Sequence, residues 1–116
     1  LIASPEYNGS VSPLLKNAID WVSRAVPGDD RSPYAGRVVG LMSASDGMLG
    51  GNRALPHLRA VLSQIGALVV PRQVGLPHAD RVLTRDDGTV DDAGVARRVA
   101  ALVDDVVRIA RRVGED

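Results

Sequence analysis

Short apolar runs alternate with segments of helical periodicity along this chain, and this alternation restricts its fold more than any other feature. The apolar runs cover residues 1–4, 38–42 and 67–70, and Pro71 should end the third of them. Each run is followed by a loop and then by a helical segment. The pattern predicts an α/β domain over residues 1–116, with a parallel sheet and helices on both of its faces.

The helical segments carry local start and stop signals. Ser12 is the expected N-cap of the first segment, which Pro27-Gly28 should end. The second should cover residues 52–65, with Gly66 just beyond its C-terminus. Asp91 and Asp92 should open the third. The apolar face expected for the first helix comprises Leu14, Leu15, Ala18, Ile19 and Val22.

Two loops follow expected strands and precede expected helices, at residues 5–10 and 43–51. In open parallel sheets, ligands bind at the carboxyl ends of the strands, where such loops lie. Glycines in both loops allow a close approach of backbone to a ligand. Tyr7 offers an aromatic ring, and Asn8 offers a hydrogen-bond donor and an acceptor. Composition alone nevertheless favours ordinary strand-to-helix turns over a ligand site.

Charge and residue usage argue against several classes of function. The formal net charge is zero, and the chain contains no cysteine and only two histidines. The arginines near the C-terminus are explained by the helix dipole, which favours cations in a last turn. No apolar stretch approaches the roughly 20 residues needed to span a bilayer. We therefore expect a cytoplasmic protein with no metal site, no nucleic-acid partner and no membrane partner.

Two sequence motifs resemble the NADPH-dependent FMN reductase family, which includes chromate, quinone and azo-dye reductases. The first is Pro5-Glu6-Tyr7-Asn8-Gly9-Ser10, followed by Leu15-Lys16-Asn17-Ala18-Ile19-Asp20-Trp21. The second is Gly47-Met48-Leu49-Gly50-Gly51-Asn52-Arg53, followed by Leu58-Arg59. The resemblance extends along the whole chain and weakens after about Pro71.

The resemblance implies a flavodoxin-like, three-layer α/β/α fold with strand order 2-1-3-4-5 and bound FMN. The cofactor-binding residues that it implies are Pro5, Glu6, Tyr7, Asn8 and Gly9 on one side of the isoalloxazine, and Ser43, Ala44, Ser45 and Gly47 on the other. It implies no catalytic side chain, because the flavin carries the chemistry. It also implies hydride transfer from NAD(P)H through FMN to a small-molecule acceptor: a quinone, a flavin, an azo compound or a metal oxyanion.

The resemblance also implies a homodimer or homotetramer, with the helix that carries Trp21 as a contact surface. Lys16, Asn17 and Asp20 on the same helix are expected to pack, cap or contact a subunit rather than catalyse. Two alternatives stay open. One is a flavodoxin-like electron-transfer protein, and the other is an inactive truncated remnant.

One departure from the family concerns the N-terminal side of the chain. Leu1-Ile2-Ala3 reads as the end of a strand already under way. The family's phosphate-binding loop and its first two strands have no counterpart, a difference of roughly 60–70 residues at about 30 residues per βαβ unit. We therefore expect this 116-residue chain by itself to bind FMN weakly or not at all.

Overall fold

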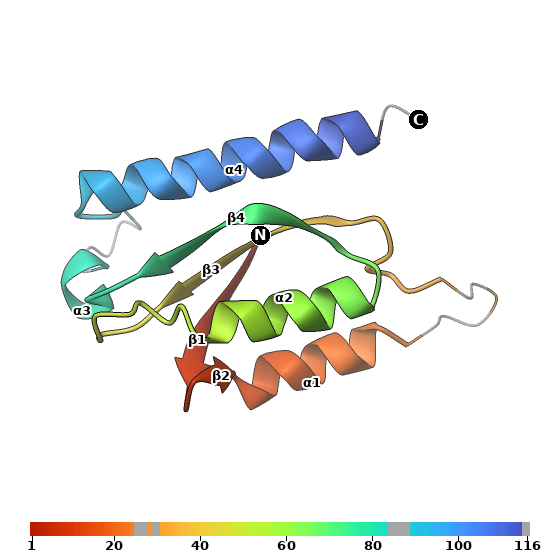
Figure 1. The fold of residues 1–116 in the computed structure, drawn as a ribbon, viewed down its shortest axis with the longest axis horizontal. Coiled ribbons are helices and arrows are strands. Elements are labelled where there is room, and N and C mark those ends of the chain that lie inside the picture. Colours follow the sequence, from red (N-terminus) through yellow and green to blue (C-terminus); the bar gives the residue numbers. More distant parts are fainter. Residues whose placement is uncertain (25–27, 29–30, 84–88, 115–116) are drawn as a thin grey trace.

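A parallel sheet with helices on both faces organises the chain (Figure 1). The computed structural model describes residues 1–24, 28, 31–83 and 89–114. The strands are β1 (Ile2–Tyr7), β2 (Ser10–Val11), β3 (Val38–Ala44) and β4 (Leu68–Leu76). The helices are α1 (Pro13–Val22), α2 (Ala54–Gln64), α3 (Ala79–Val82) and α4 (Ala93–Val113). Pro27 lies outside the described residues, as does Asp86-Asp87-Gly88, where the sequence favours a turn.

The sheet has the order β2-β1-β3-β4. Strands β1, β3 and β4 are parallel, and only the two-residue β2 runs antiparallel to its neighbour β1. Helices α1 and α2 lie on one side of the sheet and α4 on the other, which makes three layers (Figure 1). This arrangement confirms the predicted α/β class.

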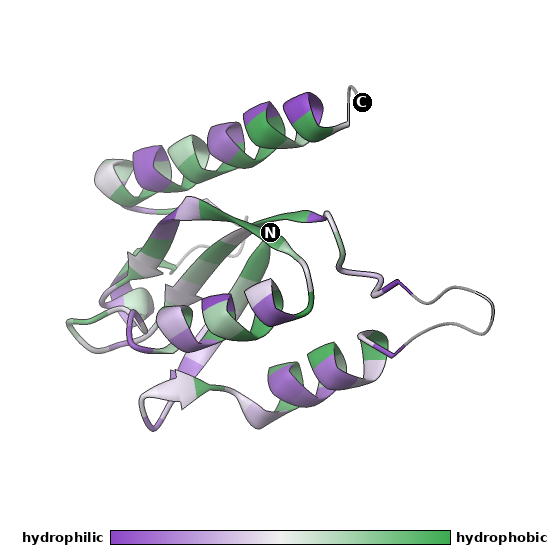
Figure 2. Cartoon of the chain, turned by 45° about the vertical axis from the view of Figure 1, so that its right-hand side comes forward, coloured by the Kyte–Doolittle hydropathy of each residue, from purple (hydrophilic) through white to green (hydrophobic). Residues whose placement is uncertain are grey.

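Each face of the sheet has its own hydrophobic core. On the α2 side, Leu55, Leu58 and Leu62 are fully buried against β3. On the α4 side, Leu102 packs with Val74 of β4. Figure 2 shows that α4 turns its hydrophobic residues towards the sheet and its hydrophilic residues outwards. The inner faces of both helices therefore follow their helical periodicity.

The helix caps expected at Ser12 and Asp92, and the glycine expected after α2, are present in the structure. The Ser12 side chain accepts a hydrogen bond from the Leu15 N–H at 3.3 Å, and the Asp92 side chain accepts one from the Val95 N–H at 2.9 Å. Gly66 follows α2 with a φ of +90°, the left-handed conformation in which glycine carries no steric cost. These caps use only neighbouring residues, so they can be recognised in the sequence.

The predicted apolar face of α1 is mostly exposed. Ile19 is buried, but Leu14 is 80% exposed and Val22 is 53% exposed. The helix also ends at Val22, before Pro27-Gly28. Because α1 lies at the edge of the sheet beside α2, the described chain gives it an apolar partner on one side only (Figure 1).

Strand β4 does not stop at Pro71. It continues to Leu76, with Pro71 inside it. The strand is at the edge of the sheet, and its pairing with β3 shifts register near the proline: Val39 pairs with Val69, but Leu41 pairs with Gln73. Proline is tolerated at such a position because an edge or a bulge does not require its missing N–H.

Candidate functional site

The carboxyl ends of the three parallel strands meet at one edge of the sheet. Pro5 of β1 pairs with Ala44 of β3, and Ala44 pairs with Leu76 of β4. The arrowheads of these strands point the same way in Figure 1. The segments that follow β1 and β3 therefore start side by side, although about forty residues separate them in the sequence.

The segment after β1 is a tight hairpin rather than the open loop expected at residues 5–10. Tyr7 pairs with Ser10, and the two residues between them have positive φ, +51° at Asn8 and +81° at Gly9. Asn-Gly is the preferred pair for such a two-residue turn, so the sequence did contain the signal for a hairpin. The turn holds Tyr7 with 56% of its surface exposed.

The segment after β3 is held in place by close backbone packing at its two glycines. The Ser43 hydroxyl donates to the Gly50 carbonyl at 2.7 Å. A Cβ at Gly51, where φ is +75°, would lie 2.8 Å from the Ser43 Cβ. A Cβ at Gly50 would lie 2.6 Å from the backbone between Leu76 and Pro77. The diglycine thus lets this loop close onto the ends of β3 and β4.

Free backbone donors lie at the middle of the same loop. Within the described part of the chain, the N–H groups of Asp46, Gly47 and Met48 donate to no acceptor. All three residues are exposed, and Ser45 beside them is half-buried. Such N–H groups can donate hydrogen bonds to carbonyl oxygens or to negatively charged groups of a ligand.

The two segments are joined by Glu6 and Arg53. The Glu6 carboxylate accepts hydrogen bonds from the Arg53 backbone N–H at 2.9 Å and from the Arg53 Nε at 2.7 Å. The guanidinium hydrogen bond is the largest cause of the lowered pKa of Glu6, against the opposing effect of burial. The carboxylate therefore stays ionised, and its side chain is only 7% exposed.

An apolar pocket of about 390 Å³ opens beside the strand ends on the α4 side of the sheet. Its lining consists of Ala3, Ser4, Pro5, Met42, Ser43, Ala44, Leu76, Leu83, Val90 and Val99. Pro5, Ser43 and Ala44 belong to the predicted cofactor-binding set. The remaining members of that set do not line this pocket, and they lie on the hairpin or on the loop after β3.

The described ranges contain no group of three or more histidine, cysteine, aspartate or glutamate side chains placed to hold a metal ion. No helix in them is long and apolar enough to cross a membrane.

The fold and the site define a parallel α/β domain whose candidate ligand-binding loops lie at the carboxyl ends of adjacent strands. The chain belongs to the NADPH-dependent FMN reductase family, whose sequence profile matches residues 1–81. Proteins of this family are oxidoreductases that use FMN and NAD(P)H.

Relatives with described activities agree with this assignment. The chain is 46% identical to a quinone reductase of Escherichia coli over 70 residues, which are 60% of this chain and 35% of the relative. It is 45% identical over 62 residues to an NAD(P)H-dependent FMN reductase of Pseudomonas aeruginosa, covering 53% of this chain and 31% of that protein. It is 30% identical over 109 residues to an FMN-dependent NADPH-azoreductase of Staphylococcus haemolyticus, and these residues cover 92% of this chain and 53% of that protein.

A solved structure shows the same fold. FerB, a flavoenzyme NAD(P)H:(acceptor) oxidoreductase from Paracoccus denitrificans, superposes with a TM-score of 0.73 and 26% sequence identity. The superposition covers 91% of this chain and 59% of FerB. The chain thus spans between about a third and about three fifths of the lengths of these proteins.

Proposed function

We propose that the full-length polypeptide carrying this chain is an NAD(P)H-dependent FMN oxidoreductase. It would transfer hydride from nicotinamide to bound FMN and on to a quinone, flavin, azo or metal-oxyanion acceptor. The observation that supports this most is the meeting of the Asn8-Gly9 turn and the loop at residues 43–51 at one edge of the sheet. We place the reaction in the cytoplasm, where NAD(P)H is available.

The residues present fit the ring of FMN. A flat ring with polar edges needs an apolar or aromatic surface and several hydrogen-bond donors. Tyr7 and Asn8 are exposed on the hairpin, and the N–H groups of Asp46, Gly47 and Met48 are free on the neighbouring loop. We propose that the cofactor-binding set, from Pro5 to Gly9 with Ser43, Ala44, Ser45 and Gly47, holds the ring between these two segments.

Bound FMN would supply the hydride-transfer chemistry, and the protein would position it. The free N–H groups of the loop would stabilise negative charge on the ring, as preorganised donors do at other sites. The hairpin would orient the ring and exclude water from one side. No side chain needs to act as an acid or base, so we assign no catalytic residue.

We propose that residues 1–116 are the C-terminal part of a flavodoxin-like domain. Strand β2 pairs only with Glu6 and Tyr7, so the edge of β1 from Ile2 to Pro5 has no partner among the described residues. The pocket next to this edge is almost wholly apolar, and an exposed apolar surface marks a place for further packing. An additional strand and helix of the same polypeptide would cover both.

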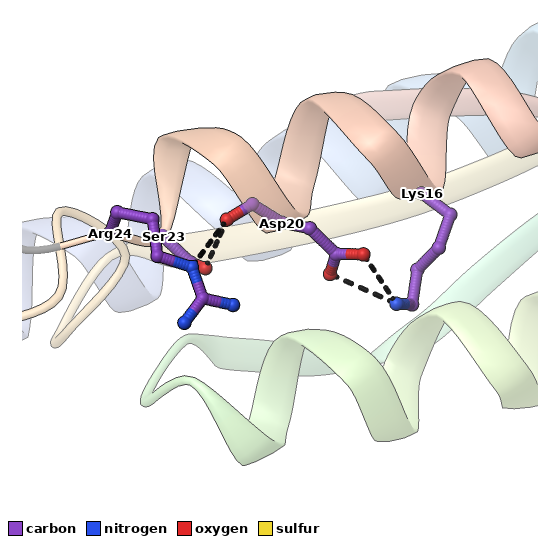
Figure 3. Close-up of polar contacts among 4 residues, drawn as sticks. All are labelled: Lys16, Asp20, Ser23 and Arg24. Carbon is purple, nitrogen blue, oxygen red and sulfur yellow. Dashed lines mark hydrogen bonds and ion pairs between the residues drawn. The ribbon is translucent and has the colours of Figure 1, made fainter.

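We further propose that the protein is a homodimer or homotetramer that uses α1. Trp21, Leu14 and Val22 are more than half exposed on this helix, although such residues are usually buried. Beside them, Lys16 binds the Asp20 carboxylate at 2.8 Å, and the Asp20 carbonyl accepts from Ser23 and Arg24 (Figure 3). An apolar stripe with a polar border is typical of a subunit contact.

The activity is tested by incubating the FMN-loaded, full-length protein with NADH or NADPH and benzoquinone, an azo dye or chromate. We expect steady NAD(P)H oxidation at several turnovers per enzyme. An electron-transfer protein of the flavodoxin type would bind FMN without steady oxidation, and an inactive remnant would do neither.

The site is tested by the double substitution Tyr7→Ala and Asn8→Ala in the full-length protein. Loss of the ring and amide should weaken FMN binding or slow flavin reduction by about tenfold or more, equivalent to at least about 1.4 kcal/mol. FMN titration and stopped-flow absorbance measure the two quantities. If both are unchanged, the site assignment is wrong.

A further inference from the structure

Glu6 is placed to do something other than touch a ligand. It lies near the end of β1, and its partner Arg53 lies just before α2, 47 positions along the chain. Both carboxylate oxygens are already used by Arg53: Oε2 by the backbone N–H and Oε1 by the guanidinium. The carboxylate is thus engaged within the protein on both of its oxygens, and its side chain is only 7% exposed.

The carboxylate also completes the start of α2. Arg53 is the N-cap residue, and its own side chain makes no capping hydrogen bond. The first N–H groups of a helix lack partners within it and favour negative charge. Glu6, which lies on β1 rather than in the loop before α2, supplies both an acceptor for the Arg53 N–H and a negative charge at the start of the helix.

A second hydrogen bond joins the hairpin to α2, this time from β2. The Ser10 Oγ and the His57 Nδ1 are 2.9 Å apart. Glu6 and Ser10 lie on the two arms of the hairpin, on either side of the Asn8-Gly9 turn. Arg53 and His57 are four residues apart at the start of α2, so they lie on one face of that helix. The hairpin is thus attached to α2 through both of its arms.

We propose that Glu6 is a positioning residue, whose bond to Arg53 holds the Asn8-Gly9 turn at a fixed distance from the loop at residues 43–51. The flavin slot depends on this distance, and the Glu6 carboxylate contributes through Arg53 rather than through the ring. This inference rests on the proposed function. It refines the expectation that Glu6 lines the isoalloxazine, because Glu6 would act through the two segments that it joins.

The test uses the full-length protein with Glu6→Gln, Arg53→Gln and the double variant. Glu6→Gln keeps the shape of the side chain, and Arg53 is 65% exposed, so both variants should fold. Asp105→Asn is the matched control. Asp105 also joins two elements through an arginine, since it accepts from the Arg72 Nε at 2.7 Å between β4 and α4.

Without FMN, both single variants should speed hydrogen exchange of the hydrogen-bonded backbone amides of the Tyr7–Ser10 pair and of Gly50 and Asn52 by about tenfold or more. With FMN, each should raise the dissociation constant by about tenfold or more, since small displacements at a binding site have large effects. The double variant should bind FMN as tightly as the weaker-binding single variant, because both substitutions remove the same Glu6–Arg53 ion pair. Asp105→Asn should change neither quantity.

Two results would overturn the inference. One is unchanged exchange at both segments in Glu6→Gln. The other is weaker FMN binding in Glu6→Gln with normal binding in Arg53→Gln, which indicates direct contact of Glu6 with the flavin. If the unmodified full-length protein neither binds FMN nor oxidises NAD(P)H, the proposed function fails instead. The exchange data without FMN would still decide whether Glu6 holds the two segments together.

Discussion

Single residues shape the loop after β3 through backbone conformation rather than side-chain chemistry. Gly51 has a φ of +75°, and the space where a Cβ would lie is occupied by Ser43. A Cβ added at Gly47, four residues earlier, would have room, with the Ser45 Oγ as its nearest contact at 3.8 Å. The two glycines therefore differ in what they contribute, although they look alike in the sequence.

Gly51→Ala should lower the free energy of unfolding by about 1–3 kcal/mol, from backbone strain and the contact with Ser43. Urea unfolding of the full-length protein measures this change. Gly47→Ala is the control and should stay within about 0.5 kcal/mol of the parent. Equal effects of the two substitutions would show that the diglycine packing is not what fixes the loop.

Residue-level prediction from the sequence worked where the signal is local. Ser12 and Asp92 cap their helices as their sequence positions suggest, because each bonds an N–H three residues ahead. The Glu6–Arg53 pair could not be predicted, since it depends on β1 and the start of α2 meeting in space. The Asn8-Gly9 hairpin could have been predicted from its turn residues.

At the scale of elements, periodicity predicted α2 and α4 well, because each buries one face against a broad sheet. It overestimated the burial of α1, because a helical stripe does not reveal whether its partner belongs to the same chain. It ended β4 too early at Pro71, because the sequence does not show that a strand is an edge strand with a register shift. The short α3 has too few residues for periodicity to detect.

The cap of α4 should make its stability depend on pH. The Val95 N–H donates a hydrogen bond to the Asp92 carboxylate. This bond is the largest cause of the lowered pKa of Asp92. The cap is therefore fully effective above about pH 4, the pKa of an unfolded aspartate, and is lost as the pH falls through the lowered pKa. Asp92→Asn keeps an acceptor that does not titrate, so it should lose less stability between about pH 6 and about pH 3. Urea unfolding at both pH values measures this, and identical losses in the two proteins would contradict it.

The exposed stripe of α1 should control assembly. Trp21→Lys puts a charge in the proposed subunit contact, and it should weaken self-association of the full-length protein by at least about tenfold. Sedimentation equilibrium measures the change. Val113→Lys is the control, because Val113 is also exposed but lies at the end of α4. An unchanged oligomer in Trp21→Lys would place the contact elsewhere.

At the scale of the whole molecule, the chain holds the two segments that we propose to bind the ring, and among the described residues one side of β1 is unpaired over residues 2–5. The parallel sheet itself was predictable, because alternation of apolar runs with helices has few other solutions. The strand order was not predictable from alternation alone, since it depends on contacts between distant residues.

The 116-residue chain alone should bind FMN at least about a hundredfold more weakly than the full-length protein. Phosphate contacts contribute about 1.5–3 kcal/mol each, and we propose that those to FMN come from the part of the polypeptide outside residues 1–116. Fluorescence titration of FMN into both proteins measures the ratio. Tight, stoichiometric binding by the short chain would contradict this expectation.

The most direct test is a crystal structure of the full-length protein grown with FMN. The isoalloxazine should lie between the Tyr7-Asn8 hairpin and the loop at residues 43–51, with its polar edge on the free N–H groups of Asp46, Gly47 and Met48. A flavin bound at another edge of the sheet, or hairpin and loop packed against each other with no room for a ring, would contradict the assignment.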